Sequence, residues 1–224
     1  MSRILSFSIA VLAASLMPAL GQAQQPALVR AVHASPDAPA VDVWLDGKMA
    51  FQGLRFKEYT DYTQVPPGNH TLQIVVSGTT NAVLGGPVNL EAGSAYTFMP
   101  AGRVSGLRLI SMGDVIQPPS TDTVNVRIVH GAATAPAVDI YVSTPFAPLP
   151  ATPVLSNVPF TVVSDYLSIP AGSYQARVAV AGTKNIAINS GRVTLPGGAI
   201  RTVVALDPST PNGPFELWFI PDVN

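Results

Sequence analysis

The first residues that could carry chemistry are a histidine and two aspartates near the start of the chain. His33, Asp37 and Asp42 lie within ten positions of one another. An imidazole and two carboxylates can ligate a divalent metal ion, or can serve as a general base and the group that orients it. An exported hydrolase or metal-dependent enzyme using these three residues is therefore the alternative function that the sequence offers.

A structural role for the histidine is favoured over this chemistry. Alternate side chains of a strand share a face, and His33 falls on the apolar face at a strand end. His130 repeats that pattern, but Thr134 stands where the first copy has Asp37. We expect both imidazoles to hydrogen-bond to loop backbone. The sequence predicts no catalytic residue, no metal site and no cofactor.

A second set of candidates is predicted on the opposite face of the same strands. Each copy offers a cation, an anion and an aromatic ring: Arg30, Asp42 and Trp44, then Arg127, Asp139 and Tyr141. The favoured interpretation is a cross-strand ion pair beside a ring, worth about 0.2–1 kcal/mol at a partly solvated surface. The other is a recognition platform, because aromatic and Arg side chains dominate binding hot spots. Aromatic faces also suit sugar rings, so these six residues are the candidate binding site.

These candidates occur twice because the chain contains an internal repeat. Residues 29–44 align with residues 126–141, and nine of the 16 paired positions are identical, among them His33 with His130 and Pro39 with Pro136. The period is near 100 residues, far longer than the 20–50 residues of solenoid repeats. Each copy is therefore expected to be a whole domain with its own core.

The repeat and the N-terminal segment predict four parts. A basic residue, the apolar run 4–16 and a small-residue stretch are typical of a secretory signal peptide, here residues 1–23. The first module is predicted over 24–116, a short Pro-Pro linker over 117–122 and the second module over 123–224. After cleavage no further apolar run is long enough to span a membrane. We expect a secreted or periplasmic protein.

Composition predicts an all-β fold. The chain has 22 Pro and 18 Gly, which leave no room for long helices, and no cysteine for disulfides or thiolate metal sites. A net charge of −1 without clustered Lys and Arg argues against nucleic-acid binding. Seven short strands per module predict two tandem β-sandwiches, immunoglobulin-like or transthyretin-like.

The strands are predicted from β-branched and aromatic runs between turn residues. The expected ranges are 27–33, 41–46, 59–65, 69–77, 82–90, 94–100 and 106–112, then 124–130, 138–143, 161–169, 173–181, 186–195, 199–206 and 214–220. The turn Pro67-Gly68-Asn69 is interpreted as a hairpin that feeds a half-buried strand.

The signature V-R-x-V-H followed by A-P-A-V-D-[VI]-[WY] occurs in both copies, at 29–44 and 126–141. With the P-x-G turn and the Gly-Thr strand end that follow, it resembles the bacterial exported family called domain of unknown function 4397. Loop 131–134 departs from the form of loop 34–37. The resemblance implies an exported β-sandwich and brings no catalytic residues. We expect a non-catalytic binding or structural module of the cell envelope or extracellular space, whose partner is an unknown protein or a cell-wall carbohydrate.

Overall fold

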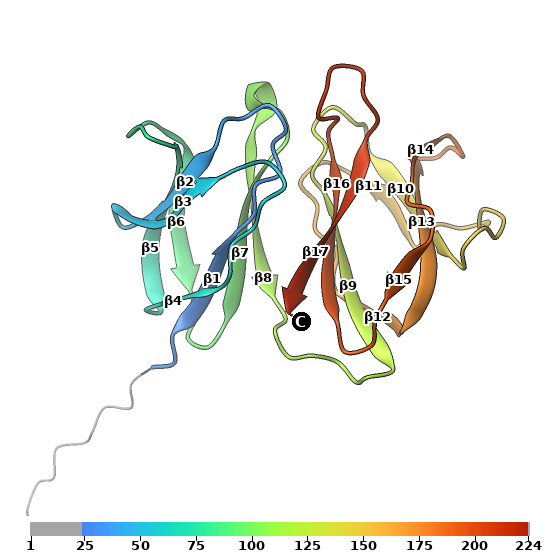
Figure 1. The fold of residues 1–224 in the computed structure, drawn as a ribbon, viewed down its shortest axis with the longest axis horizontal. Helices are drawn as coiled ribbons and strands as arrows, with labels where there is room; N and C mark the ends of the chain where they lie inside the picture. The colour runs from blue at the N-terminus through green and yellow to red at the C-terminus, as the bar shows by residue number, and fades with distance from the viewer. Residues whose placement is uncertain (1–23, 224) are drawn as a thin grey trace, which may run out of the picture.

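The computed structural model describes residues 24–223 and consists almost entirely of β-strands (Figure 1). Within this range the single helical element is the 3₁₀ turn η1 (Val104–Gly106), and no helix is long and apolar enough to cross a membrane. The predicted signal peptide lies outside the described residues. The predicted all-β class with sandwich domains is confirmed.

The first half of the chain forms two four-stranded sheets that face each other. One has the order β4 (Thr63–Val65), β1 (Ala27–Ala31), β7 (Ala95–Ala101), β8 (Arg108–Asp114), and the other β3 (Lys48–Leu54), β2 (Val41–Leu45), β5 (Gly68–Val76), β6 (Ala82–Leu90). β1 and β7 run parallel. Val29, Val43, Leu72 and Ile74 are among the buried residues that form the core between these sheets.

The second half repeats this arrangement. One sheet has the order β12 (Leu167–Pro170), β9 (Thr123–His130), β16 (Ile200–Leu206), β17 (Glu216–Val223). The other has the order β11 (Leu155–Val158), β10 (Val138–Ser143), β13 (Gly172–Val180), β14 (Ile186–Asn189), with β15 (Val193–Leu195) also paired to β13. β9 and β16 run parallel, as β1 and β7 do. The sequence repeat is therefore a repeat of strand topology.

Two strands were not expected from the sequence, β3 and β11. β3 follows β2 through Asp46 and Gly47, which have φ of 50° and 73°. Positive φ at both central residues is the geometry of a two-residue hairpin turn, for which Asp-Gly is a strong signal. The dipeptide Asp46-Gly47 is therefore a sequence signal from which β3 could have been predicted. Because β11 follows a proline-rich loop, no comparable signal precedes it.

The hairpin predicted at Pro67-Gly68-Asn69 is wrong. The strand before the turn, β4, pairs with β1, whereas the strand after it, β5, pairs with β2 and β6. The turn therefore carries the chain from one sheet to the other. Pro66 and Pro67 have no N–H to donate, so the ladder of a hairpin cannot start there. The buried positions Leu72 and Ile74 within β5 are as predicted.

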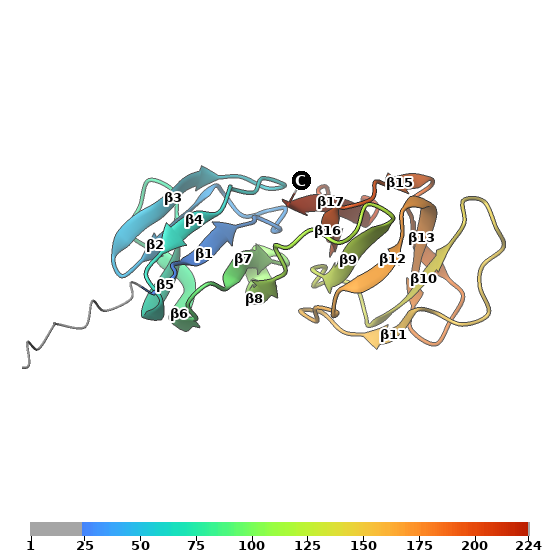
Figure 2. The same ribbon diagram turned by 90° about the horizontal axis from the view of Figure 1, so that it is seen from below.

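The two halves pack against each other through the sheets that contain β8 and β17 (Figures 1 and 2). A further apolar cluster is made from both halves and includes Met99, Ile110 and Met112 with Val129, Val204 and Ile220. Each half thus has a core of its own and contributes to a shared one. The segment between them is anchored to the second half, since Ala171 and Gly198 donate backbone hydrogen bonds to Asp122 and Ser120.

Candidate functional site

The junction between the halves buries an arginine from each side. Arg30 on β1 is 2% exposed and points away from the core of its own sandwich. Its Nε donates to Thr97 Oγ1 at 2.7 Å, while Nη1 and Nη2 cross the junction to Pro221 O at 2.9 Å and Asp222 Oδ1 at 2.5 Å. Every nitrogen of this guanidinium therefore has a partner, and two of the three partners are in the other half.

Arg127 on β9 repeats this pattern in the opposite direction. Its Nε donates to Thr202 Oγ1 and its Nη1 to Gly113 O, both at 2.8 Å, and its Nη2 pairs with Asp114 of the first half. The two pairs also approach each other, because Arg30 Nε lies 3.9 Å from Asp114 and Arg127 Nη2 lies 3.8 Å from Asp222. Two cations and two anions thus form one reciprocal cluster, which we call the junction network.

Two tyrosines complete the junction network. Tyr62 donates to Asp114 at 2.7 Å and Tyr166 donates to Asp222 at 2.9 Å. The guanidinium of Arg30 lies 5.0 Å from the ring centre of Tyr62, and that of Arg127 lies 4.9 Å from the ring centre of Tyr166. Burial raises the pKa of both phenols far above the ordinary value, with a further contribution from the carboxylates. Both tyrosines therefore stay protonated donors.

The carboxylates of the junction network also keep Arg30 ionised. Burial alone would lower the pKa of Arg30, but the negative charges of Asp222 and Asp114 outweigh it, and the pKa lies above its ordinary value. Breaking one partner of such a pair leaves an uncompensated charge in a dry site. The junction network therefore fixes the orientation of the two halves.

The expected cross-strand ion pair between Arg30 and Asp42 is wrong. The two residues belong to different sheets, since Arg30 is on β1 and Asp42 is on β2. Asp42 is 1% exposed and accepts hydrogen bonds from Gly53 N at 2.7 Å and Ser77 Oγ at 2.8 Å. The reason is that the outer face of β1 is covered by the other half of the molecule, which supplies the carboxylate.

Asp139 has the same place in the second half. It accepts from Asn157 N at 2.8 Å and Gly182 N at 2.9 Å, and is 6% exposed. In both halves the backbone N–H that donates to the aspartate belongs to a residue with positive φ on the neighbouring strand, 68° at Gly53 and 51° at Asn157. The strand pairing between β2 and β3, and that between β10 and β11, is irregular at these places. These aspartates therefore hold an edge-strand bulge in place, and Arg127 pairs elsewhere.

The aromatic members of the predicted platform do not form a common surface. Trp44 is half-buried on β2, and its indole N–H has no hydrogen-bond partner among residues 24–223. Tyr141 is 2% exposed and its hydroxyl accepts from Lys184 Nζ at 3.1 Å, with the ammonium 4.4 Å from the ring centre. The structure brings neither ring together with an arginine of the predicted set.

Both signature histidines contact loop backbone. His33 Nε2 lies 3.1 Å from Pro39 O and His130 Nε2 lies 3.1 Å from Pro136 O. The Nδ1 atoms accept from backbone N–H groups two residues later, at 3.3 Å in both halves. Burial lowers the pKa of both imidazoles. Each histidine thus joins a strand end to the loop that contains the signature proline.

The three residues of the alternative enzymatic site do not share a partner. Asp37 accepts from Val104 N at 2.9 Å and lies 3.6 Å from Arg103, whereas His33 and Asp42 have the separate contacts given above. In the part of the chain that the structure describes, no three His, Asp or Glu side chains are grouped so that they could hold a metal ion. The three residues of the alternative function are therefore not assembled into one site.

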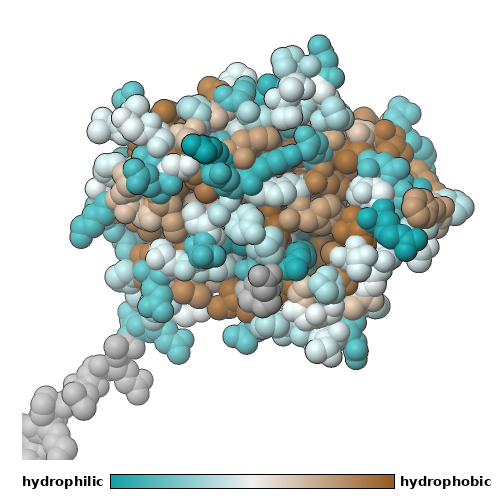
Figure 3. Space-filling model, viewed as in Figure 1, coloured by the Kyte–Doolittle hydropathy of each residue, from teal (hydrophilic) through white to brown (hydrophobic). Residues whose placement is uncertain are grey.

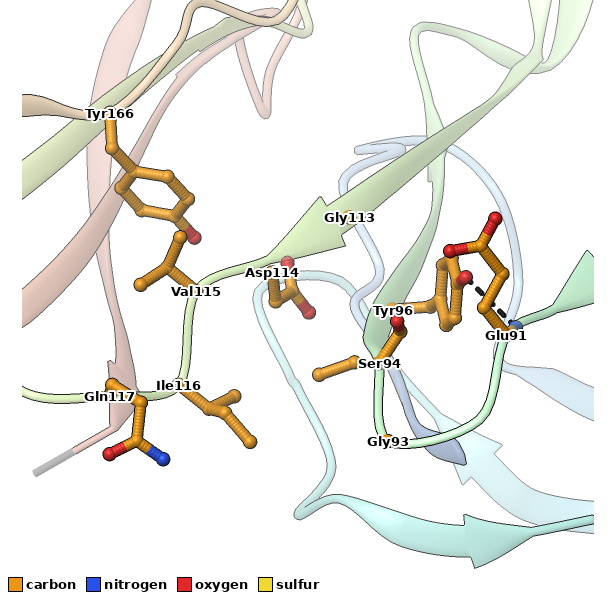
Figure 4. Close-up of a pocket in the computed structure, with 11 residues that line it drawn as sticks. Glu91, Gly93, Ser94, Tyr96, Gly113, Asp114, Val115, Ile116, Gln117 and Tyr166 are labelled. Atoms are coloured by element: carbon orange, nitrogen blue, oxygen red, sulfur yellow. Dashed lines mark hydrogen bonds between the residues drawn. The ribbon is translucent and has the colours of Figure 1, made fainter. Parts of the chain in front are cut away.

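Two open clefts lie at the junction. The larger, of about 500 Å³, is bordered by the β6–β7 turn and the segment after β8. Figure 4 shows Asp114 between Tyr166 on one side and Tyr96 with Glu91 on the other. The smaller, of about 240 Å³, is lined by residues 59–62 with Arg30, Pro221 and Asp222.

The residues of the junction network were only partly accessible from the sequence. Asp61-Tyr62 aligns with Asp165-Tyr166 in the repeat, which could have marked both tyrosines. Asp114 follows a glycine and Asp222 follows a proline, so no common motif marks the two carboxylates.

Comparison with known proteins agrees with the repeat. A family model described as Domain of unknown function (DUF4397) matches residues 27–141 and 147–224. The chain belongs to this family. No curated protein matches its sequence.

Several solved structures are loosely similar to this DUF4397 chain. One concerns alpha-glucan binding by a streptococcal virulence factor, with 12% identity, 82% of this chain and 94% of that chain covered, and a TM-score of 0.26. A second concerns family 41 carbohydrate-binding modules from streptococcal virulence factors, with 9% identity, 79% and 93% coverage and a TM-score of 0.27. A third is the Bacillus anthracis TIE protein, with 9% identity, 83% and 34% coverage and a TM-score of 0.25. TM-scores this low carry no information about what this chain binds.

Proposed function

We propose that this chain is an exported, non-catalytic binding module in which two sandwiches act as one rigid body. The observation that carries the proposal is the junction network. Interfaces between domains of one chain usually permit relative motion. Here two buried ion pairs and a shared apolar cluster link the halves. A fixed orientation keeps the clefts at the junction preformed, as binding sites usually are.

The contacts of the chemistry-bearing residues also support a binding role. His33 and His130 are engaged by loop backbone, and Asp42 and Asp139 by edge-strand backbone. Side chains with these contacts stabilise the fold. The junction clefts are open to a partner, and each of them is lined by residues of both halves.

The proposal is tested by co-sedimentation of the purified chain with washed envelope material from the source cells. We expect saturable retention of the folded chain and none of the urea-unfolded chain. Mass spectrometry of the native protein should give a chain lacking residues 1–23. A turnover activity that disappears in a folded His33→Ala variant, or the absence of saturable retention, would reject a non-catalytic binding role.

A further inference from the structure

The two edges of the junction are related by the repeat but differ in chemistry. Tyr59 forms a β-bridge with Val32 in the first half, and Val163 forms the corresponding β-bridge with Val129 in the second half. Trp218 lies opposite Val204 in the pairing of β17 with β16, and Ile110 lies opposite Met99 in the corresponding pairing of β8 with β7. One edge therefore carries Tyr59 and Trp218, and at the corresponding places the other edge carries Val163 and Ile110. The junction network is common to both edges, whereas this aromatic pair belongs to one, which we call the aromatic edge.

The aromatic pair spans the two halves. The ring centres of Tyr59 and Trp218 lie 6.3 Å apart, and their planes are inclined by 45°. Tyr59 is 42% exposed and Trp218 is half-buried. In Figures 1 and 2 the segment after β3 lies beside β17, and Figure 3 shows apolar and hydrophilic residues side by side on this face. An ion pair between Lys57 and Glu216 joins the same two segments.

The smaller junction cleft opens next to this pair. Its volume of about 240 Å³ is below the range of about 300–1,000 Å³ for drug-sized ligands, which suits a single ring with polar substituents. Tyr59 belongs to the lining, and so does Asp61, whose carboxylate forms no hydrogen bond or ion pair with any described residue. The cleft thus offers an aromatic face next to an unoccupied acceptor.

The charges at the aromatic edge disfavour an anionic ligand. Lys57 is neutralised by Glu216, and Arg30 at the cleft floor is neutralised by Asp222. The uncompensated charge at this edge is the carboxylate of Asp61, which would repel an anionic ligand. A neutral ring with an apolar face and several hydroxyl groups fits both the aromatic rings and the free carboxylate.

We propose that the aromatic edge binds a neutral saccharide, with a sugar ring against Tyr59 and Trp218 and its hydroxyl groups donating to Asp61. This assignment rests on the binding role proposed above and names its ligand class. Neither ring of this pair lines the larger cleft. Aromatic side chains that give a rigid contact area commonly dominate the energy of such sites.

The test is calorimetric titration of the full chain with three hexasaccharides, namely cellohexaose, chitohexaose and maltohexaose. We expect at least one to bind, and Tyr59→Ala and Trp218→Leu each to weaken it by about tenfold or more, a loss of about 1.4 kcal/mol or more. Tyr59→Phe should bind as the parent does. Phe146→Ala, which removes an aromatic ring that is 74% exposed in the second half, is the matched control and should change nothing.

The saccharide assignment is wrong if none of the three probes binds at millimolar concentration, or if a probe binds equally well to parent and Tyr59→Ala. Urea unfolding of each variant establishes that it is folded. Retention on envelope material, measured in parallel, separates the two proposals. If Tyr59→Ala is retained as well as the parent, the aromatic edge is refuted while the binding role stands. If neither is retained, the binding role also fails.

Discussion

Asp114 is the residue whose replacement tests the junction network most directly. Its carboxylate is wholly buried and accepts from Arg127 across the junction, and from Tyr62 and Thr97 within its own half. Asp114→Asn keeps the volume and removes the charge. Arg127 then retains Thr202 and a backbone carbonyl, with its remaining carboxylate 3.8 Å away.

The expected cost is about 3–5 kcal/mol, the usual range when one partner of a buried ion pair is removed. That is a large fraction of the roughly 5–15 kcal/mol by which native proteins are stable. The assay is urea unfolding followed by tryptophan fluorescence and circular dichroism together. Because the network joins the halves, we expect one coincident transition in the parent and two separated transitions in Asp114→Asn.

A double-mutant cycle isolates the pair from other effects of the substitution. Asp114→Leu with Arg127→Leu removes both charges, so the double variant should lose clearly less than the sum of the two single variants. Asp222→Asn should cost about as much as Asp114→Asn, because the contacts are reciprocal. Asp165→Asn, at an exposed position, is the control and should change stability by less than about 0.5 kcal/mol. Additive losses, or a cost below about 1 kcal/mol for Asp114→Asn, would refute the proposed coupling.

Three further perturbations follow from the same contacts. The pKa of Tyr62 and Tyr166 is raised on folding, so their contribution to stability is fully present below the unfolded pKa of about 10 and is lost as pH rises above it. The urea midpoint should therefore fall above pH 10, and it should fall less in the variant that combines Tyr62→Phe with Tyr166→Phe. The pKa of His33 and His130 is lowered on folding, so their contribution to stability is present above about pH 6.5 and is lost as pH falls below it. The urea midpoint should therefore decline between pH 7.5 and pH 5. Gly197→Ala would place a Cβ on the backbone of the linker, and we expect a lower melting temperature than in the parent; an unchanged value would mean that the linker does not pack there.

Strand positions were largely predictable because period-two patterns report local geometry. The same patterns correctly separate the face of Arg30 from that of Val29. They do not report what covers a face. Arg30 is opposite the core of its own sandwich, which predicts exposure, but its carboxylate partner is 192 positions away on the other half. A contact of that range is fixed by the packing of two modules, and no local pattern contains it.

Turn chemistry explains most of the remaining differences. Asp46-Gly47 forces a tight hairpin and thus creates β3, while Pro66-Pro67 prevents one and sends the chain to the opposite sheet. Predicting the second outcome requires knowing that two sheets are stacked within reach. The aromatic edge was not accessible for a related reason, since Tyr59 and Trp218 meet only after both halves have folded and docked.

The reciprocal contacts at the junction have the form of a symmetric pair in which each member supplies the same arginine and the same aspartate. Had two separate chains met in this way, their association would weaken on dilution, and any substitution would appear at both edges at once. Joining the members through one linker makes their encounter intramolecular, with an effective concentration on the order of millimolar. It also allows each edge to change independently. A tryptophan can then occupy one side while isoleucine occupies the corresponding position on the other side.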